Sequence, residues 1–371
     1  MINTDIFIAG GGPAGLAAAI KAAEYGADVI IAERDYEPGG QLTKQTHSFF
    51  GSKDEYAGTR GIKIAEQMQQ KVQSNSHIEL MLEATVQGYY EDDVITVSHE
   101  NEFKKIKADK FIIATGAAEK MLFFSNNDLP GVYGAGAVQT LMNIYGVVPG
   151  KRVLMIGSGN IGLIVSYQLL QAGVKVAGIV EAMPEIGGYL VHAAKIRRAG
   201  VPIYTGYTIK KALGKKCVRQ AVISKLDKDW NEIANSEEYI DVDTICLAVG
   251  LRPLIDLLLQ AGCKMAFIPE LGGDVPLRDD NLRTTNEKIY VAGDVDGIEE
   301  ATAAILEGEL AALSAVIDLG YAEEGIRDKR QETKEKLYSL RKGPVGEKIR
   351  SGLNKVRGVD YVTKDRYSHI R

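Results

Sequence analysis

The chain has 371 residues, of which 45% are apolar and 25% charged, the composition of a soluble globular protein with two or three domains. Its formal net charge of −5 argues against a general nucleic-acid-binding protein. No uncharged apolar run of about 18 residues occurs and the N-terminus leads directly into a predicted strand, so we expect no membrane span, no secretion and a cytoplasmic location.

The first 33 residues contain a β-turn-α-β pattern. An apolar strand at residues 5–9 runs into the sequence GGGPAG at residues 10–15, an Ala-rich helix follows at 16–25, and a second apolar strand at 28–32 ends in Glu33. In such a turn the first glycine permits the tight bend, the second admits a pyrophosphate, and the third lets helix and strand pack closely. The helix start attracts the phosphates and the acid accepts hydrogen bonds from a ribose. The pattern predicts a dinucleotide site.

The same pattern occurs a second time. A strand at residues 153–156 leads into GSGNIG at 157–162, a helix extends to about residue 171, and a strand at 174–180 ends in Glu181. A Gly-Gly pair follows each acid at the same offset, at Gly39-Gly40 and at Gly187-Gly188. Each half later carries an apolar strand ending in Ala-x-Gly. We therefore predict an α/β fold with two Rossmann-like dinucleotide-binding domains.

The segments between these landmarks predict further elements. A helix is expected at residues 62–72, and strands at 78–82, 85–90, 94–98 and 103–106 suggest a small antiparallel meander before a strand at 111–113. The second fold has its own strand-rich insertion, at 221–223 and 239–242.

The first fold needs a returning segment to complete its sheet. After residue 250 the chain offers a helix at 254–260, a strand at 289–292 and a helix at 300–319. We therefore predict an FAD-type domain formed by residues 1–118 and 250–326, an inserted domain at 119–249 and a C-terminal tail at 327–371.

The tail is basic, with 14 Lys and Arg residues against 6 Asp and Glu residues. Its pattern predicts helices at 327–342 and 347–356, separated by Gly343-Pro344-Val345-Gly346. Two interpretations remain open: a solvated, partly disordered tail, or an arm that docks on a partner chain.

The three cysteines, Cys217, Cys246 and Cys263, have no metal-ligand or C-x-x-C spacing, so no metal site is predicted. Cys246 lies in an apolar strand and is interpreted as a small core residue. We interpret the other two as inert.

The sequence VAGD at residues 291–294 resembles the C-terminal motif of two-dinucleotide flavoproteins. Together with the motifs above, residues 1 to about 320 resemble a flavoprotein of the pyridine nucleotide–disulfide oxidoreductase type. The resemblance implies FAD on the first fold and a nicotinamide dinucleotide on the second. The implied FAD contacts are Gly10, Gly12, Pro13, Ala14, Gly15, Glu33, Arg34, Gly40, Gln41, Leu42, Thr43, Val86, Thr115, Gly116, Gly293, Asp294, Ala301 and Thr302. The implied NAD contacts are Gly157, Gly159, Asn160, Ile161, Glu181 and Gly250.

Glu181 predicts which nicotinamide cofactor binds. A carboxylate at the end of the second strand bonds ribose hydroxyls and repels a 2′-phosphate, and no arginine follows it directly in the sequence. We expect NADH in preference to NADPH.

The chain departs from thioredoxin reductases, which its Gly39-Gly40 region resembles, at the redox-active positions. The resemblance places Ala135 and Val138 where those enzymes carry a C-x-x-C. Without a thiolate no disulfide exchange can occur, so we predict that the protein is not a disulfide reductase.

Residues 129–140, 147–151 and 186–192 resemble the α subunits of opine oxidase, hydrogen cyanide synthase and dye-linked amino-acid dehydrogenases. Those subunits pass electrons between NAD(H) or FAD and a second, substrate-oxidising flavoprotein. The C-terminal region here contains no cysteine, which excludes an iron–sulfur relay within it. The segment around His47 also resembles a flavoprotein of anaerobic glycerol-3-phosphate dehydrogenases, although Gln45 stands where that group has a cysteine.

The leading hypothesis is an FAD-dependent NAD(H) oxidoreductase subunit that exchanges electrons with a partner dehydrogenase or acceptor subunit. Its alternatives are a stand-alone NADH:acceptor reductase or NADH oxidase, an α subunit of an amino-acid, opine or glycerol-3-phosphate dehydrogenase, and a flavin-bearing assembly subunit. His47 is the candidate catalytic residue beside the flavin, with an ordinary loop histidine as its alternative. A homo-oligomer is possible. The substrate and the direction of electron flow stay open.

Overall fold

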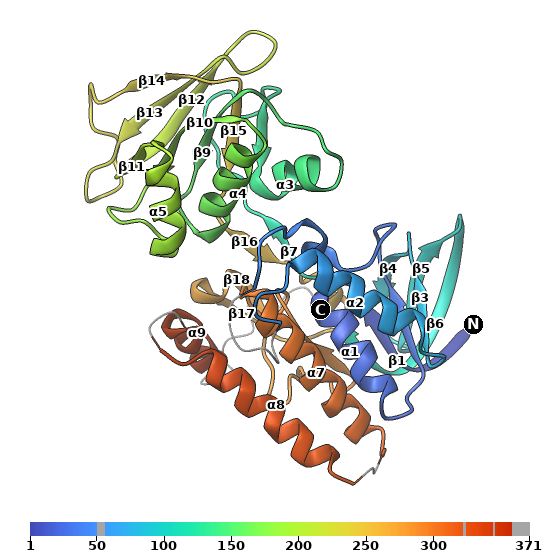
Figure 1. Cartoon of the computed structure of the whole chain (residues 1–371). Coiled ribbons are helices and arrows are strands. Elements are labelled where there is room, and N and C mark those ends of the chain that lie inside the picture. The colour runs from blue at the N-terminus through green and yellow to red at the C-terminus, as the bar shows by residue number, and fades with distance from the viewer. Residues whose placement is uncertain (50–55, 322–323, 344–345, 358–371) are drawn as a thin grey trace. The chain divides into compact units, whose positions relative to one another are not determined.

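The computed structural model describes residues 1–49, 56–321, 324–343 and 346–357. The chain divides into two compact units (Figure 1): unit 1 comprises Met1–Ala118 and the chain from Arg252 onward, and unit 2 is Glu119–Leu251. Two short strands, β7 (Ala117–Glu119) and β16 (Leu251–Pro253), carry the chain between the units and pair with each other.

Unit 1 is built on a seven-stranded sheet of order β3-β2-β1-β6-β5-β4, with β19 also paired to β6. Strands β3, β2, β1, β6 and β19 are parallel, whereas β4 and β5 form an antiparallel meander with the first half of β6. The strands are β1 (Ile2–Ala9), β2 (Val29–Ala32), β3 (Ile78–Met81), β4 (Thr85–Tyr89), β5 (Val94–His99), β6 (Glu102–Ile113) and β19 (Ile289–Val291).

Two expectations for this sheet were wrong. The segments 103–106 and 111–113 form one long strand, β6, rather than two. Its first half alternates between exposed and buried residues and its last three residues are all buried, which is why the sequence pattern changes in the middle of the strand. The segment around Ile78 lies in the parallel sheet beside β2, outside the meander.

Helices cover the sheet of unit 1. Alanines of α1 and α7 pack against Ile6, Ile8 and Ile31 on one face, and an added Cβ on Gly308 of α7 would lie 2.1 Å from the Ala14 carbonyl oxygen. The small residues therefore allow these two helices to approach closely. The remaining elements are α1 (Pro13–Ala23), η1 (Gly40–Lys44), α2 (Gly61–Gln73), α6 (Asp256–Gln260), β17 (Met265–Ile268), η3 (Pro269–Leu271), β18 (Gly273–Pro276), α7 (Ala301–Asp318), α8 (Ile326–Leu340) and α9 (Glu347–Arg357).

Unit 2 repeats the architecture with a parallel sheet of order β11-β10-β9-β15-β8. Its helices cover one face and an antiparallel sheet, β12-β13-β14, packs on the other. The expected α/β class with two Rossmann-like domains is therefore confirmed. The elements are β8 (Val132–Gly134), α3 (Ala135–Asn143), β9 (Arg152–Ile156), α4 (Asn160–Gln171), β10 (Lys175–Glu181), α5 (Leu190–Arg198), β11 (Ile203–Thr205), β12 (Tyr207–Leu213), β13 (Gln220–Lys225), β14 (Glu238–Asp241) and β15 (Thr244–Leu247).

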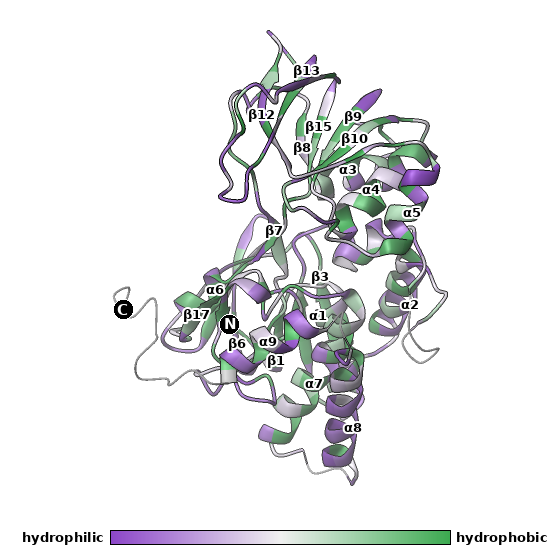
Figure 2. Ribbon diagram, turned by 90° about the vertical axis from the view of Figure 1, so that its left-hand side faces the viewer, coloured by the Kyte–Doolittle hydropathy of each residue, from purple (hydrophilic) through white to green (hydrophobic). Residues whose placement is uncertain are grey.

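The C-terminal segment is helical, as expected, but α8 and α9 pack onto unit 1. Helix α8 runs along α7, and its Ile326 and Leu337 belong to the main core cluster (Figure 1). Helix α8 is largely hydrophilic, whereas the α7 that it covers is more hydrophobic (Figure 2). Helix α9 adds Leu353 and Val356 to a small cluster with Leu271 and Val275. Residues 326–357 therefore pack on the chain itself and do not form a freely solvated tail, whereas docking on a partner chain stays a prediction.

Among the described residues, none of the helices combines the length and the apolar character needed to cross a bilayer.

Candidate functional site

The first glycine turn lies between β1 and α1. Gly10 has φ +106°, and an added Cβ there would lie 2.4 Å from the Ala114 carbonyl oxygen. A Cβ on Gly15 would lie 1.9 Å from the Gly10 carbonyl oxygen. Both positions therefore require glycine. Gly12, the N-cap of α1, differs, because a Cβ there would meet nothing within 4 Å.

The open side of Gly12 lies at the N-terminal end of α1, with Pro13 in the first turn. The first N–H groups of a helix have no partner within the helix, and the dipole there attracts anions. Ala14 and Gly15 follow in the same turn. This end of α1 can hold a phosphate.

Glu33 directly follows β2 and is bound to the glycine turn. Its Oε2 accepts the Gly11 N–H at 2.6 Å and its Oε1 accepts the Asp35 N–H at 2.9 Å. The Glu33 carbonyl accepts the Ala84 N–H at 2.8 Å, which brings the start of β4, and with it Val86, to the same region. Arg34, in contrast, is exposed to solvent.

The Gly-Gly pair folds back onto the first turn. The Gly39 N–H donates to the Gly11 carbonyl at 2.7 Å, and a Cβ on Gly40 would lie 3.0 Å from the Gly12 Cα. In η1, Leu42 is buried, the Thr43 hydroxyl donates to the Gly40 carbonyl at 2.8 Å and Gln41 is exposed.

His47 lies between η1 and α2. It is half-buried, and its carbonyl accepts the Gly61 N–H at 3.4 Å. The structure thus places the candidate catalytic histidine beside the start of α2.

The other predicted FAD contacts of unit 1 lie where β6 and β19 end. Because β1, β6 and β19 are parallel neighbours, their carboxyl ends meet at one edge of the sheet. Thr115 follows β6 and donates its hydroxyl to the Leu254 carbonyl at 2.8 Å; Gly116 has φ +73°. Gly293 follows β19 with φ +77°, and a Cβ on it would lie 3.1 Å from the Ala14 Cβ.

Asp294 is half-buried, and its Oδ1 accepts the Glu299 N–H at 3.4 Å. Burial raises the pKa of the Asp294 carboxyl to about 6. Ala301 and Thr302 open α7 a few residues further on.

The turn of unit 2 has the same steric demands. A Cβ on Gly157 would lie 2.3 Å from the Ala248 carbonyl oxygen, and one on Gly162 would lie 2.1 Å from the Gly157 carbonyl oxygen. A Cβ on Gly159, the N-cap of α4, would again meet nothing within 4 Å. Ile161 in the first turn of α4 is exposed. This helix end therefore also suits a phosphate.

Glu181 repeats the position of Glu33. Its Oε2 accepts the N–H and the hydroxyl of Ser158, at 2.8 and 2.6 Å, and its Oε1 accepts the Met183 N–H at 2.9 Å. Asn160 accepts the Tyr189 N–H at 2.8 Å. Gly250, with φ +111°, accepts the Lys120 N–H through its carbonyl at 2.9 Å.

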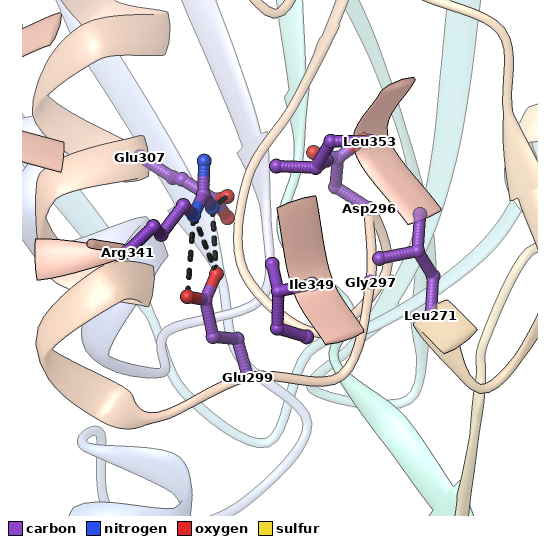
Figure 3. Close-up of a pocket in the computed structure, with 8 residues that line it drawn as sticks. All are labelled: Leu271, Asp296, Gly297, Glu299, Glu307, Arg341, Ile349 and Leu353. Atoms are coloured by element: carbon purple, nitrogen blue, oxygen red, sulfur yellow. Dashed lines mark hydrogen bonds and ion pairs between the residues drawn. The ribbon is translucent and has the colours of Figure 1, made fainter. Parts of the chain in front are cut away.

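A buried charged cluster behind the Gly293–Asp294 turn was not predicted. Arg278 binds Asp296 through both carboxylate oxygens, at 3.0 and 2.6 Å. Arg341 pairs with Glu299 and Glu307 (Figure 3). The sequence does contain one sign of this cluster, because Glu307 is a charged residue within the apolar pattern of α7. Arg341 stands in a charged stretch, where nothing in the sequence distinguishes it from exposed residues.

The three cysteines differ in their burial. Cys246 is fully buried in β15 and burial raises its pKa; Cys263 is also buried, and Cys217 is half-buried. Ala135 and Val138 are buried in α3. Within residues 1–49, 56–321, 324–343 and 346–357 no group of three or more His, Cys, Asp or Glu side chains could hold a metal ion.

Each unit therefore has a glycine turn followed by the start of a helix, with an acid hydrogen-bonded to the turn. The second glycine of each turn has free space on the side where a side chain would lie. This donor set fits a dinucleotide: N–H groups for the pyrophosphate and a carboxylate for a ribose.

The model of the pyridine nucleotide-disulphide oxidoreductase family matches residues 4–308. The first subunit (A) of opine oxidase from Agrobacterium tumefaciens (strain Ach5) is 28% identical over 335 residues, which are 85% of this chain and 66% of that protein. The HcnB subunit of hydrogen cyanide synthase from Pseudomonas aeruginosa is 26% identical, over 85% of this chain and 71% of its own length. The match to the alpha subunit of sarcosine oxidase from Rhizobium meliloti, 28% identical, covers 72% of this chain and 26% of that protein. The chain thus spans about two-thirds or less of several of these relatives.

Two solved structures show the same fold. L-proline dehydrogenase from P. horikoshii superposes with a TM-score of 0.66 and 25% identity, over 89% of this chain and 59% of that one. Thioredoxin reductase from T. acidophilum superposes with a TM-score of 0.70 and 22% identity, over 86% and 99% of the two chains.

Proposed function

This chain belongs to the pyridine nucleotide-disulphide oxidoreductase family, and from that membership and the two sites we propose that it passes electrons between NAD(H), FAD and a partner subunit. It is an oxidoreductase, as expected from its sequence. Unit 1 binds FAD and unit 2 binds NAD(H). The observation that carries the proposal is the repeated glycine turn. At the start of a helix in each unit, a Cβ on the second glycine, Gly12 or Gly159, would meet no protein atom within 4 Å. An acid, Glu33 or Glu181, is hydrogen-bonded to each turn.

The assignment of FAD to unit 1 is supported by the Gly293–Asp294 turn, which lies against α1 only in that unit. Gly293 approaches Ala14, so the turn lies directly against the helix start to which we assign the phosphate. FAD, when bound, supplies two-electron transfer with a nicotinamide. The residues of the chain bind and orient the two nucleotides.

The preference for NADH is supported by Glu181. Its carboxylate is held by Ser158 and Met183 at the end of β10, so its negative charge is fixed where a ribose would lie. A fixed carboxylate favours hydroxyl donors and disfavours a 2′-phosphate. Arg197 and Arg198, in contrast, are exposed on α5.

The partner is supported by the relatives, several of which are named as subunits. Ala135 and Val138, which stand where thioredoxin reductases carry a C-x-x-C, provide no thiol, so we propose that electrons pass to another acceptor. We propose a second flavoprotein, dehydrogenase or acceptor subunit, as in an amino-acid, opine or glycerol-3-phosphate-type dehydrogenase.

Anaerobic stopped-flow mixing of the FAD-loaded protein with NADH tests the proposal. Rapid loss of the oxidised flavin absorption, followed by slow re-oxidation in air, is expected for an electron-transfer subunit. Rapid re-oxidation by oxygen or a dye without any partner would favour a stand-alone NADH:acceptor reductase or oxidase. If NADH leaves the flavin oxidised, a flavin-bearing assembly subunit is favoured over the electron-transfer subunit and the stand-alone enzyme. A colourless protein that takes up no FAD would contradict the proposal. Co-purification from the native host then identifies the partner.

A further inference from the structure

The turn between β19 and α7 is held from behind by a residue of the C-terminal extension, residues 326–357. This extension lies beyond residue 308, where the family match ends. Arg341 follows α8 directly and its side chain is only 9% exposed. Its position in the fold therefore belongs to this extension and not to the dinucleotide fold itself.

Arg341 binds two acids at once. Its Nε and Nη2 donate to Glu299 Oε2 at 2.9 and 2.6 Å, and Nη2 also donates to Glu307 Oε1 (Figure 3). Glu307 is buried in α7, so the ion pair is largely removed from water. Such a pair is costly to break, because the remaining charge keeps its desolvation cost.

The residues that carry the two acids, Glu307 and Glu299, also form hydrogen bonds with the predicted flavin contacts. The other oxygen of Glu307, Oε2, accepts the Gly293 N–H at 2.8 Å. The Glu299 N–H donates to Asp294 Oδ1 at 3.4 Å. Arg341 is thus joined to Gly293 through one glutamate side chain, and to Asp294 through the residue that carries the other.

Other residues of the C-terminal extension contact the backbone of Arg341. Arg350 of α9 donates to the carbonyls of Arg341 and, at 2.9 Å, of Gly343. A Cβ on Gly346 would lie 2.1 Å from the Arg341 carbonyl oxygen. Helix α9 and the turn before it therefore pack on the end of α8 through the backbone of Arg341.

We propose that Arg341 is a positioning residue for the FAD site: through Glu307 and Glu299 it holds the Gly293–Asp294 turn in its binding geometry and neutralises the negative charge behind it. This inference rests on the proposed binding of FAD to unit 1. Without Arg341, a charged Glu307 repels the pyrophosphate, and a protonated Glu307 is a weaker acceptor for the Gly293 N–H. Either result weakens FAD binding.

The test is FAD titration of the full-length FAD-free protein, followed by flavin fluorescence. Arg341→Met is expected to raise the Kd for FAD by roughly tenfold or more, and Arg341→Lys, which keeps the charge but not the two-pronged hydrogen bonding, by less. Adding Glu307→Gln to Arg341→Met removes the uncompensated charge and should recover most of the affinity. This rescue separates a charge effect on the turn from loss of packing.

Lys355→Met is the matched control, because it removes an ion pair of α9 with Glu270 without touching Arg341 or either glutamate. If it raises the Kd as much as Arg341→Met, or if Arg341→Met binds FAD like the wild type, the positioning role is wrong. Where Arg341→Met does not fold, Arg341→Lys replaces it in the comparison, and an FAD Kd unchanged from the wild type in that variant also overturns the role. A wild-type protein that binds no FAD contradicts the proposed function itself, which distinguishes the two failures.

Discussion

The backbone N–H of Ser158 donates to Oε2 of Glu181 at 2.8 Å, at the position where the Gly11 N–H donates to Glu33 at 2.6 Å in the other unit. The two turns share this hydrogen bond, and the residue that donates it is a glycine in unit 1 and a serine in unit 2. The Ser158 hydroxyl adds a second bond to Glu181 and accepts the Gly187 N–H at 3.1 Å. The acid of unit 2 is therefore held more firmly.

Replacing Glu181 should change the choice of nicotinamide cofactor. The wild type is expected to have a kcat/KM for NADH at least about tenfold above that for NADPH, which corresponds to about 1.4 kcal/mol. Glu181→Ala removes the fixed negative charge and should reduce the ratio toward one. Arg197→Ala, on an exposed part of α5, is the control and should leave the ratio unchanged. Equal kcat/KM values in the wild type would refute the assignment.

Alanine at Gly12 and at Gly15 should have opposite effects. A methyl on Gly12 meets no protein atom within 4 Å, so Gly12→Ala should fold with a stability change below about 1 kcal/mol but lose FAD affinity. A methyl on Gly15 would lie 1.9 Å from the Gly10 carbonyl oxygen, so Gly15→Ala should destabilise the fold by more than about 2 kcal/mol. Urea unfolding of the FAD-free proteins and FAD titration measure the two effects. Normal FAD affinity in Gly12→Ala would contradict the role of this turn.

The stability of the FAD-free protein should depend on Asp294 and pH. Because burial raises the pKa of Asp294 from 3.8 to about 6, its neutral form is favoured in the folded state. The stability that this carboxyl contributes is fully present below about pH 4 and is lost as the pH rises through about 6. Asp294→Asn should therefore be more stable than the wild type above pH 6, by up to about 3 kcal/mol, and equally stable near pH 4. The free energy of unfolding of both proteins is measured between about pH 4 and 7. A difference between wild type and Asp294→Asn that does not change with pH would contradict the prediction.

Truncating Leu337 should destabilise unit 1. Leu337 of α8 is 5% exposed within the main core cluster, and a Leu→Ala change at such a site costs about 2–5 kcal/mol. Tyr338 is largely exposed on the next position, so Tyr338→Ala should cost less than about 0.5 kcal/mol. Chemical denaturation compares the two variants. Equal effects would mean that α8 does not pack on α7 in solution.

The glycine turns could be predicted from sequence because their steric demands are local. Gly10 and Gly15 need no side chain for reasons that lie within a few residues of the turn and in the neighbouring strand, and the motif records those reasons. The acid at the end of the second strand follows from the same short pattern.

The charged cluster could not be predicted, because its members come from distant segments. Arg278, just after β18, pairs with Asp296, and Arg341, just after α8, pairs with Glu307 of α7; no short motif encodes either contact. Arg341 stands among many exposed charges in the sequence, and only the fold distinguishes it from them. The role of His47 remains a prediction.

The pairing of β19 with β6 has a consequence for synthesis of the protein. Ile289 aligns with Phe111 in the sheet of unit 1, although all of unit 2 separates them along the chain. During translation, unit 2 is a continuous segment and can fold as soon as it leaves the ribosome, whereas unit 1 must wait for its last strand. A nascent chain that stops before Ile289 would therefore contain a complete unit 2 and an open, aggregation-prone sheet edge in unit 1, which gives chaperones a defined moment at which to act.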